Sequence, residues 1–417
     1  MKILYIAFAC NPYVGSEAFC GWSWPLAMRK YCEVYVVTRK ENKTGIEKYI
    51  REHKINDIKF FYYDIPDAIN IYYKSGKMYM LYSVLWQTTS LSFIKKLHEQ
   101  YHFDYIHQVT LGDFRLINPA WKLKSKFIFG PVGGAQLTPK SLKSYIGNDD
   151  KSENRREWIN KMIKARPLYR KALNRTYLVL AANPETQTYL QECVDEPRKC
   201  KLLTENGVNA DQIHGIPEKI DHDKVMLLWS GRMIGRKGLS FLIDVIKQVN
   251  PQKNFVLKLV GDGSEKENLE EKARKLGLEN KVEFVGKVPY TEMQQLYQTS
   301  DIFVFPSLRE TTGTVLFEAM ANGLPIVTFN QNGAALLIDN TCGRKVNINQ
   351  SIEKIRTEFA SYISELIDNA ELRNYLGNNA YDRILKNYLW ETKCDNFFKE
   401  YLFKGMTKNE KIDFNHK

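Results

Sequence analysis

Short apolar runs alternate with longer amphipathic stretches along most of the chain. Each run is bounded by polar, Gly or Pro residues and has the length of a buried strand, whereas the stretches between runs carry apolar residues at helical spacing. Seven runs lie in the first half: 2–8, 33–38, 57–64, 103–107, 126–130, 177–183 and 200–206. Five lie in the second half: 225–231, 255–261, 281–286, 301–307 and 324–329.

This alternation predicts an α/β protein in which parallel sheets are covered by helices on both faces. The runs are too many for one sheet of ordinary size, so we expect two doubly wound domains. A polar stretch containing Gly and Pro, 206–222, separates them. The expected units are 1–205, 206–385 and a helical end, 386–417, whose tail from 404 frays. Helices are expected at 237–249, 264–276, 289–299 and 314–322.

The bulk composition is that of a globular protein, with 44% hydrophobic and 26% charged residues among 417. The net charge of +12 suits three partners: an anionic nucleotide, nucleic acid or an anionic membrane surface. Seven scattered cysteines, without zinc-type spacing, indicate free thiols in a reducing cytoplasm. The apolar N-terminal run, 3–9, is short for a signal peptide and favours a first strand. No uncharged apolar stretch is as long as a membrane-spanning helix, which needs about 18 such residues.

Two acids in an otherwise apolar segment attract attention. Glu310 and Glu318 have seven residues between them, in "RETTGTVLFEA". Glu310 lies on a loop after a buried strand, and the helix that begins near Thr314 carries Glu318. A helix start preceded by Gly313 leaves free backbone N–H groups, which suit a phosphate, while a carboxylate suits a ribose diol. The pair therefore predicts one ligand approached from two sides. The competing interpretation makes Glu310 a capping residue and Glu318 a solvated one.

Basic residues follow another strand end. Arg232, Arg236 and Lys237 lie within six positions after Ser230–Gly231. Anionic ligands bind at the carboxyl ends of parallel strands, and cations at a helix start otherwise oppose the helix dipole. Weaker signals are the GxG in "LVGDGSE" and a helix start at Gly15 and Ser16, with Ser16 as the N-cap.

Together, "SGRMIGRKG", "LVGDGSE", "VEFVGKVPY", "SLRETTGTVLFEAMANGLPIV" and "TENGV" resemble the C-terminal domain of glycosyltransferase family 4. These are retaining enzymes of GT-B fold, with two Rossmann-like domains facing across a cleft and a C-terminal helix that returns to the first domain. The first half is similar to the family more loosely, through "NPYVGSEAFCGW", "DYIHQVT" and "FGPVGGA".

The resemblance implies roles for individual residues. Arg232 and Lys237 would bind the donor diphosphate, Glu310 the donor sugar and Glu318 the ribose. His107 is a candidate for the family's site histidine, although the usual His-x-His is absent here, since Val109 takes the second position; Thr110 or Asp113 could replace it, or the role is absent. Family members often have Gly-Phe-Gly in place of Thr311-Thr312-Gly313. The implied donor-binding set is Gly15, Ser16, Gly231, Gly286, Val288, Thr312, Gly313, Thr314, Val315 and Glu318.

The implied reaction is retaining transfer of a hexose-type sugar from a nucleoside diphosphate sugar, UDP before GDP, to a hydroxyl of a glycan or lipid-linked acceptor in surface polysaccharide or glycolipid synthesis. The family precedent is front-face attack, with the departing phosphate taking the acceptor proton and with no metal or other cofactor. The protein would be cytoplasmic. The Tyr- and Trp-rich segment 58–97 is either a core helix or an acceptor groove that also contacts the inner face of the membrane.

Other functions remain open at this point. A sugar-nucleotide epimerase or a phosphorylase of the same fold, and a sugar-nucleotide-binding protein without turnover, are alternatives to the transferase. A Rossmann dehydrogenase is less favoured because "LVGDGSE" lacks the third glycine. Nucleic acid is excluded as a partner, since no recognition motif accompanies the charge.

Overall fold

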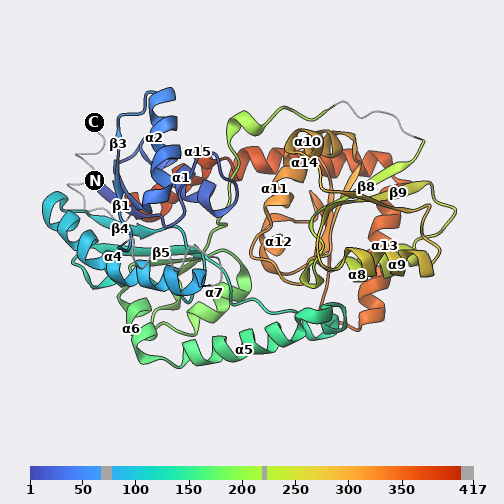
Figure 1. Ribbon diagram of the computed structural model, residues 1–417. Helices are drawn as coiled ribbons and strands as arrows, with labels where there is room; N and C mark the ends of the chain where they lie inside the picture. Colours follow the sequence, from blue (N-terminus) through green and yellow to red (C-terminus); the bar gives the residue numbers. More distant parts are fainter. Residues whose placement is uncertain (67–77, 218–222, 405–417) are drawn as a thin grey trace.

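A computed structural model describes residues 1–66, 78–217 and 223–404, and shows two α/β domains side by side (Figure 1). The first is built on a parallel seven-stranded sheet in the order β3-β2-β1-β4-β5-β6-β7. All seven apolar runs of the first half form its strands. These are β1 (Lys2–Ile6), β2 (Glu33–Thr38), β3 (Ile58–Tyr62), β4 (Tyr105–Gln108), β5 (Lys126–Val132), β6 (Leu178–Ala181) and β7 (Cys200–Leu202).

The second domain has a parallel six-stranded sheet in the order β10-β9-β8-β11-β12-β13. The five apolar runs of the second half form five strands, and the sixth, Gly343–Val346, was missed because "GRKV" holds only one apolar residue. The strands are β8 (Val225–Arg232), β9 (Phe255–Asp262), β10 (Val282–Gly286), β11 (Ile302–Phe305), β12 (Ile326–Phe329) and β13 (Gly343–Val346).

Helices cover both faces of each sheet, which explains why the strand runs are apolar almost throughout. The four expected helices correspond to α8, α9, α10 and α11, and their ends agree within two residues. The helices are α1 (Glu17–Met28), α2 (Lys43–Glu52), α4 (Tyr79–Tyr101), α5 (Asp150–Lys164), α6 (Pro167–Arg175), α7 (Pro184–Gln191), α8 (Leu239–Gln248), α9 (Lys266–Lys275), α10 (Tyr290–Thr299), α11 (Thr314–Ala321), α12 (Asn332–Leu337), α13 (Ile352–Asp368), α14 (Ala370–Asn387) and α15 (Trp390–Phe397).

The C-terminal segment returns to the first domain, as expected. Helix α15 packs against α1, and the ring of Trp24 on α1 lies 5.0 Å from that of Phe397. In the π-helical turn Phe398–Phe403, the ring of Phe398 stacks on that of Tyr31, just after α1. The chain therefore passes to the second domain near Val208 and returns to the first near Tyr388. The two crossings pair with each other, because Val208 N donates to Tyr388 O at 2.9 Å and Trp390 N donates to Val208 O at 3.0 Å.

One short segment departs from the division expected between the halves. The 3₁₀ turns Lys140–Tyr145 and Gly147–Asp149 precede the 206–222 stretch by some sixty residues, yet Leu142 and Ile146 belong to the core of the second domain. Of the expected 206–222 boundary, residues 218–222 lie outside the described part, as do 67–77 of the aromatic segment and the tail from 405.

Two further expectations were that no helix spans a membrane and that the cysteines are free thiols. Among the described residues, no helix is long and apolar enough to cross a membrane. All seven cysteines lie within those residues, and each is a free thiol.

Candidate active site

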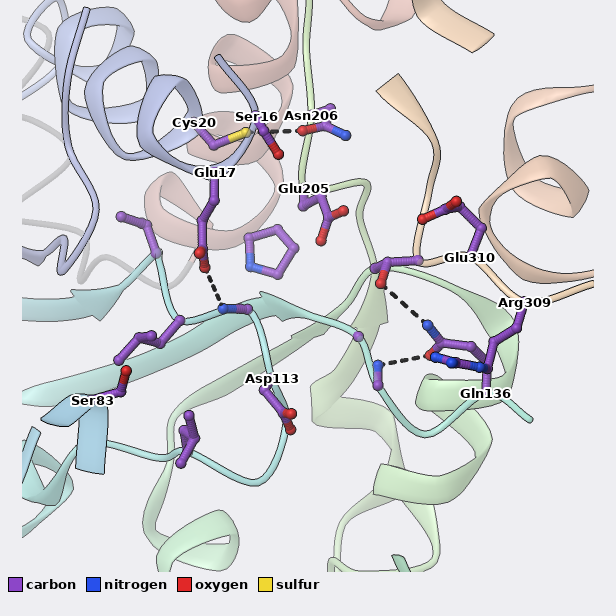
Figure 2. Close-up of a pocket in the computed structure, with 18 of the residues that line it drawn as sticks. Ser16, Glu17, Cys20, Ser83, Asp113, Gln136, Glu205, Asn206, Arg309 and Glu310 are labelled. Atoms are coloured by element: carbon purple, nitrogen blue, oxygen red, sulfur yellow. Dashed lines mark hydrogen bonds between the residues drawn. The ribbon is translucent and has the colours of Figure 1, made fainter. Parts of the chain in front are cut away.

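Three adjoining cavities lie between the domains. The central cavity, about 500 Å³, is lined by residues of both domains, including Glu17, Asp113, Glu205 and Glu310 (Figure 2). A smaller one of about 240 Å³, here called the helix cavity, lies at the start of α11. The outer cavity, about 360 Å³, lies beyond it. Glu205 and Glu310 line both the central and the helix cavities, Thr314 lines both the helix and the outer cavities, and Ser16 lines all three. The cavities therefore follow one another in the order central, helix, outer.

Glu310 lies where the central and helix cavities meet. Its Oε2 accepts hydrogen bonds from Lys237 Nζ and, at 3.3 Å, from Arg236 Nη1. Burial acts to raise the pKa of Glu310, but the charges of Lys237 and Arg236 outweigh it and hold the pKa below its usual range. Burial lowers the pKa of Lys237 against the opposing charge of Glu310. The site thus keeps a charged carboxylate beside two cations.

The helix cavity has the features of a phosphate site. Arg232 and Lys237 line it together with Gly313, Thr314 and Val315, the first residues of α11 and its N-cap. The φ angle of Gly313 is 93°, a conformation that favours glycine, and it turns the loop sharply into the helix. Within the described part of the chain, the guanidinium of Arg232 has no ion-pair or hydrogen-bond partner. Free N–H groups and an unpaired cation therefore face one small space.

Glu318 lines the outer cavity, one helical turn further on. Its Oε2 accepts a hydrogen bond of 2.7 Å from the hydroxyl of Tyr297, and burial raises its pKa. Gly15 lines the same cavity, and so does Tyr290, whose side chain is 61% exposed. Glu310 and Glu318 are thus separated by the helix cavity. The expectation that they approach one ligand from two sides fits this arrangement.

Ser16 is the N-cap residue of α1, as expected, but its φ of 61° is unusual for a residue with a side chain, and its hydroxyl makes no capping hydrogen bond. The next residue, Glu17, accepts a 2.8 Å hydrogen bond from Gly112 N. The strained turn therefore brings Gly15 and Ser16 over the helix and outer cavities while Glu17 is fixed in the central one.

His107 does not reach any of these cavities. Its side chain is fully buried among the rings of Tyr5, Trp24 and Phe397, and its Nε2 donates to Gly130 O at 2.6 Å. Burial lowers its pKa to about 3, so the ring stays neutral at physiological pH. The expectation of a catalytic His107 is therefore corrected to a structural role in the core of the first domain.

The other two replacements considered for the site histidine differ in position. Thr110 is buried, and its Oγ1 accepts a 3.1 Å hydrogen bond from Ala9 N. Asp113 lines the central cavity and is bound by Arg115, whose Nη1 lies 2.7 Å from Asp113 Oδ2. Of the three candidates, only Asp113 can contact a ligand there.

Thr312 is a second correction, because the structure buries it completely and its neighbour Thr311 lines the central cavity instead. Thr311 Oγ1 accepts a 3.2 Å hydrogen bond from Gln136 Nε2, and Thr311 O accepts one from Asn183 Nδ2. Gly133 lies so close that a Cβ there would come within 2.3 Å of Thr311 Cγ2. The two domains therefore meet at Thr311.

Gly231, Gly286 and Val288 lie near the site without lining any of the three cavities. A Cβ at the neighbouring Gly261 would come within 1.8 Å of Gly231 O, so the strand ends touch backbone to backbone. Gly286 ends β10 with a φ of 83°, and Val288 packs against the core. Both precede Tyr290, which does reach the outer cavity. Their donor-binding role stays a prediction.

Glu205 is the main residue that motif spacing did not single out, although it is part of "TENGV". It lines both the central and the helix cavities, and Figure 2 shows it between Glu17 and Glu310. Burial, reinforced by those two carboxylates, raises its pKa to about 8. Its loop is fixed by the buried Lys393 of α15, whose Nζ donates to Thr204 O and, at 2.9 Å, to Asn206 O. A protonated Glu205 can donate a hydrogen bond to an oxygen in either cavity.

Arg156 and Arg309 also line the central cavity and were not expected there. Arg309 Nε lies 2.6 Å from Glu153 Oε1, whereas Arg156 donates to Gly134 O at 2.6 Å. Arg309 directly precedes Glu310 in a recognised motif, whereas Arg156 belongs to none. In the described ranges of the chain, no group of three or more His, Cys, Asp or Glu side chains is arranged to hold a metal ion. The metal-free reaction stays a prediction.

Comparisons with known proteins agree with this picture. Residues 212–383 match a family model described as glycosyl transferases group 1. An uncharacterized glycosyltransferase of Methanocaldococcus jannaschii is 30% identical over 161 residues, which is 39% of this chain and 40% of that protein. A lipopolysaccharide core biosynthesis glycosyltransferase of Rhizobium meliloti is 33% identical over 145 residues, 33% of this chain and 40% of that protein. The match thus spans well under half of these relatives.

A solved structure extends the likeness in fold to both domains. The structure of Anabaena HepE in complex with UDP superposes with a TM-score of 0.64 and 19% sequence identity, over 96% of this chain and 99% of that one. The architecture shared with such neighbours is the GT-B fold, in which two Rossmann-like domains enclose a cleft. The fold expected from the sequence is therefore confirmed.

Proposed function

We propose that this protein is a retaining glycosyltransferase. It moves a hexose from a nucleoside diphosphate sugar to a hydroxyl of a glycan or lipid-linked acceptor, in surface polysaccharide or glycolipid synthesis. The observation that carries the proposal is the order of the three cavities. A donor sugar, its diphosphate and its nucleoside follow one another in the same order as Glu310, the start of α11 and Glu318.

The leaving group is the diphosphate. As the bond from the sugar C1 to the phosphate oxygen breaks, negative charge grows on that oxygen, and Arg232, Lys237 and the N–H groups of α11 face the place where it grows. Stabilising this charge lowers the barrier. The acceptor oxygen forms the new bond to C1 on the same face, and its proton passes to the departing phosphate. Because these cations can neutralise the leaving group, we propose that no metal ion takes part.

The acceptor hydroxyl would enter from the central cavity, which the first domain lines with Glu17, Asp113 and Glu205. Glu310 would contact the sugar hydroxyls, since its pairing with Lys237 and Arg236 holds it charged and in place. Glu318 would accept hydrogen bonds from the ribose. UDP is the first nucleotide to test because the Anabaena neighbour binds it, and GDP is the second.

The experiment is a thermal-shift series in EDTA with UDP, GDP, ADP and NAD on the wild type and Glu318→Ala. Ligand that binds the folded state raises the melting temperature with its occupancy. We expect a shift with one nucleoside diphosphate that Glu318→Ala loses and Glu292→Ala, an exposed acid of α10, retains. A shift with NAD alone, or with none of them, contradicts the proposal. Binding without release of the nucleotide from any sugar donor would instead indicate a sugar-nucleotide-binding protein.

A further inference from the structure

Helices α5 and α6 present two different faces. The inner face of α5 packs on the protein through Glu153, Asn160 and Ile163, which are buried. On the outer face, Trp158 and Met162 follow each other at helical spacing and are 62% and 45% exposed, and Leu168 at the start of α6 is 65% exposed. Large apolar side chains left in water on one surface mark a contact site.

The same surface is strongly basic. Residues 150–175 contain nine Lys or Arg against three Asp or Glu, a surplus of six in a chain whose net charge is +12. In the part of the chain that the structure describes, no ion pair or side-chain hydrogen bond engages the charged ends of Arg155, Arg166 or Lys171. The outer face is defined here as Trp158, Met162 and Leu168 with the exposed cations Arg155, Lys161, Arg166 and Lys171. Lys161 is paired with Glu157 at 2.9 Å, so the face combines apolar side chains with three unpaired cations and one paired cation.

A second exposed apolar group lies at the start of α4, where Tyr79, Met80, Leu81 and Val84 reach the surface. It differs in two respects. The sequence from 78 to 94 contains no charged residue, and Tyr79 and Met80 line the central cavity. This group therefore belongs to the acceptor side of the proposed active site. Of these two groups, the outer face of α5 and α6 is the one that pairs apolar side chains with cations.

We propose that the outer face of α5 and α6 docks on an anionic lipid bilayer. Trp158, Met162 and Leu168 enter the boundary between head groups and acyl chains, where an aromatic side chain with a polar edge is favoured, and the surrounding cations contact lipid phosphates. This assigns membrane contact to a different segment from 58–97, the aromatic stretch that the sequence suggested. The inference goes beyond the proposed function and does not depend on it.

The placement of α5 gives the docking a consequence. Figure 1 shows α5 and α6 along one edge of the molecule, with α5 extending from the first domain towards the second. Arg156, on the opposite side of α5 from Trp158, lines the central cavity. A helix is about 10 Å thick with its side chains, so the docked face would hold the acceptor cavity close to the lipid surface.

The test is flotation of the full chain with phosphatidylcholine vesicles, with and without phosphatidylglycerol, at low and high salt. We expect binding to the anionic vesicles only, weakened by salt because the Debye length falls from about 10 Å at 0.1 M to about 3 Å at 1 M. Removing the three apolar side chains should lower vesicle partitioning about tenfold or more. The apolar variant is Trp158→Ser, Met162→Ser and Leu168→Ser, and the charge variant is Arg155→Gln, Lys161→Gln, Arg166→Gln and Lys171→Gln.

Two matched controls separate this face from general effects. A variant with the same loss of four charges on the second domain should keep vesicle binding within about threefold. Serine at Tyr79, Met80 and Leu81 should do the same. The melting temperature of each variant without ligand reports folding and is scored separately from vesicle binding. The charge control is Arg274→Gln, Lys275→Gln, Lys287→Gln and Lys354→Gln.

Four results would overturn the proposal. The wild type could fail to float with anionic vesicles, or the charge control could lose as much binding as the charge variant, which would make net charge the cause. The α4 variant could lose binding while the apolar variant keeps it. Light scattering could show that the apolar variant changes self-association and leaves vesicle binding intact, which would make the face a contact between copies of this chain.

Discussion

The two walls of the cleft hold their charged groups in different ways. On the second-domain wall, charged side chains neutralise one another directly: Glu310 is paired with Lys237 and Arg236, and all three follow the carboxyl ends of β8 and β11. A wall of this kind is formed before any ligand arrives. Under the proposed function, its ligand is the donor diphosphate, bound at the start of α11.

On the first-domain wall, the polar groups are held by distant backbone atoms. Glu17 accepts from Gly112 N, 95 positions away, and Arg156 donates to Gly134 O. Glu205, in between, has a pKa raised to about 8 by burial, so it is mostly protonated at neutral pH. The difference teaches that the second-domain wall carries fixed charges, whereas the first-domain wall presents groups that can donate or accept hydrogen bonds. Under the proposed function, the first would meet the donor and the second the acceptor.

The largest effect is expected from the second-domain wall. Arg232→Ala and Lys237→Ala should each lower turnover about 10²–10³-fold, because they remove stabilisation that develops with the leaving-group charge. The affinity for UDP should fall by less. The measurement is UDP release from the best UDP-hexose beside UDP binding by calorimetry. Arg274→Ala, an exposed cation of the same domain, is the control. Equal losses in turnover and UDP affinity would reduce the two cations to simple binding groups.

The contact between the walls gives the next largest effect. Gly133→Ala should lower turnover about tenfold or more, since its Cβ would come within 2.3 Å of Thr311 Cγ2 and overpacking costs about 1–3 kcal/mol. The double variant Gly133→Ala, Thr311→Gly removes the clash and should recover most of the activity lost. If the double variant is no better than Gly133→Ala, the domains do not meet at Thr311 during the reaction.

Glu205 on the first-domain wall should make the stability of the folded protein depend on pH. The pKa of Glu205 is raised from 4.5 to about 8 in the folded state, so the folded protein keeps a proton that the unfolded chain releases above pH 4.5. The contribution of Glu205 to the free energy of unfolding therefore falls as pH rises from 5 to 8. Between these pH values, the melting temperature of the wild type should drop by a few degrees more than that of Glu205→Gln, since 1 kcal/mol corresponds to about 2–4 °C. Parallel curves for the two proteins would contradict the protonated Glu205, and Glu292→Gln is the control.

The smallest effect on turnover is expected behind the first-domain wall. His107→Gln should lower the melting temperature by several degrees, because a buried hydrogen bond to Gly130 O is disturbed at a cost of about 1–3 kcal/mol. Turnover per folded molecule should stay within about twofold, since His107 lies outside the cavities. A large loss of turnover at unchanged melting temperature would restore His107 as a catalytic residue.

The sequence predicted the second-domain wall better than the first for a physical reason. In a parallel sheet, strand ends meet at one edge, so residues that follow β8 and β11 come together wherever the strands are placed correctly. The apolar runs located those strands, and Gly313 located the start of α11. The positions of Glu310, Glu318, Arg232 and Lys237 follow from the strands and helices of the second domain alone, so no contact with the first domain had to be predicted.

The two corrected expectations, for His107 and Thr312, depended on contacts with distant parts of the chain. Whether His107 faces the cleft depends on which side of β4 is covered by α1 and α15, and residues on both sides of that strand are buried. Which of Thr311 and Thr312 points inward depends on Gly133 and Gln136, far away in sequence. Glu205 lay in a recognised motif, but its raised pKa results from Glu17 and Glu310, which only the fold brings near.

The paired crossings at Val208 and Leu389 have a mechanical consequence. Two chain segments that are hydrogen-bonded to each other restrict relative motion more than a single linker does. The segment 140–149 adds another connection, because Leu142 and Ile146 belong to the core of the second domain. We therefore expect the domains to keep their spacing where the chain crosses between them. Spin labels on the two domains beside Val208 should hold their separation when UDP binds, whereas labels across the mouth of the central cavity report any opening.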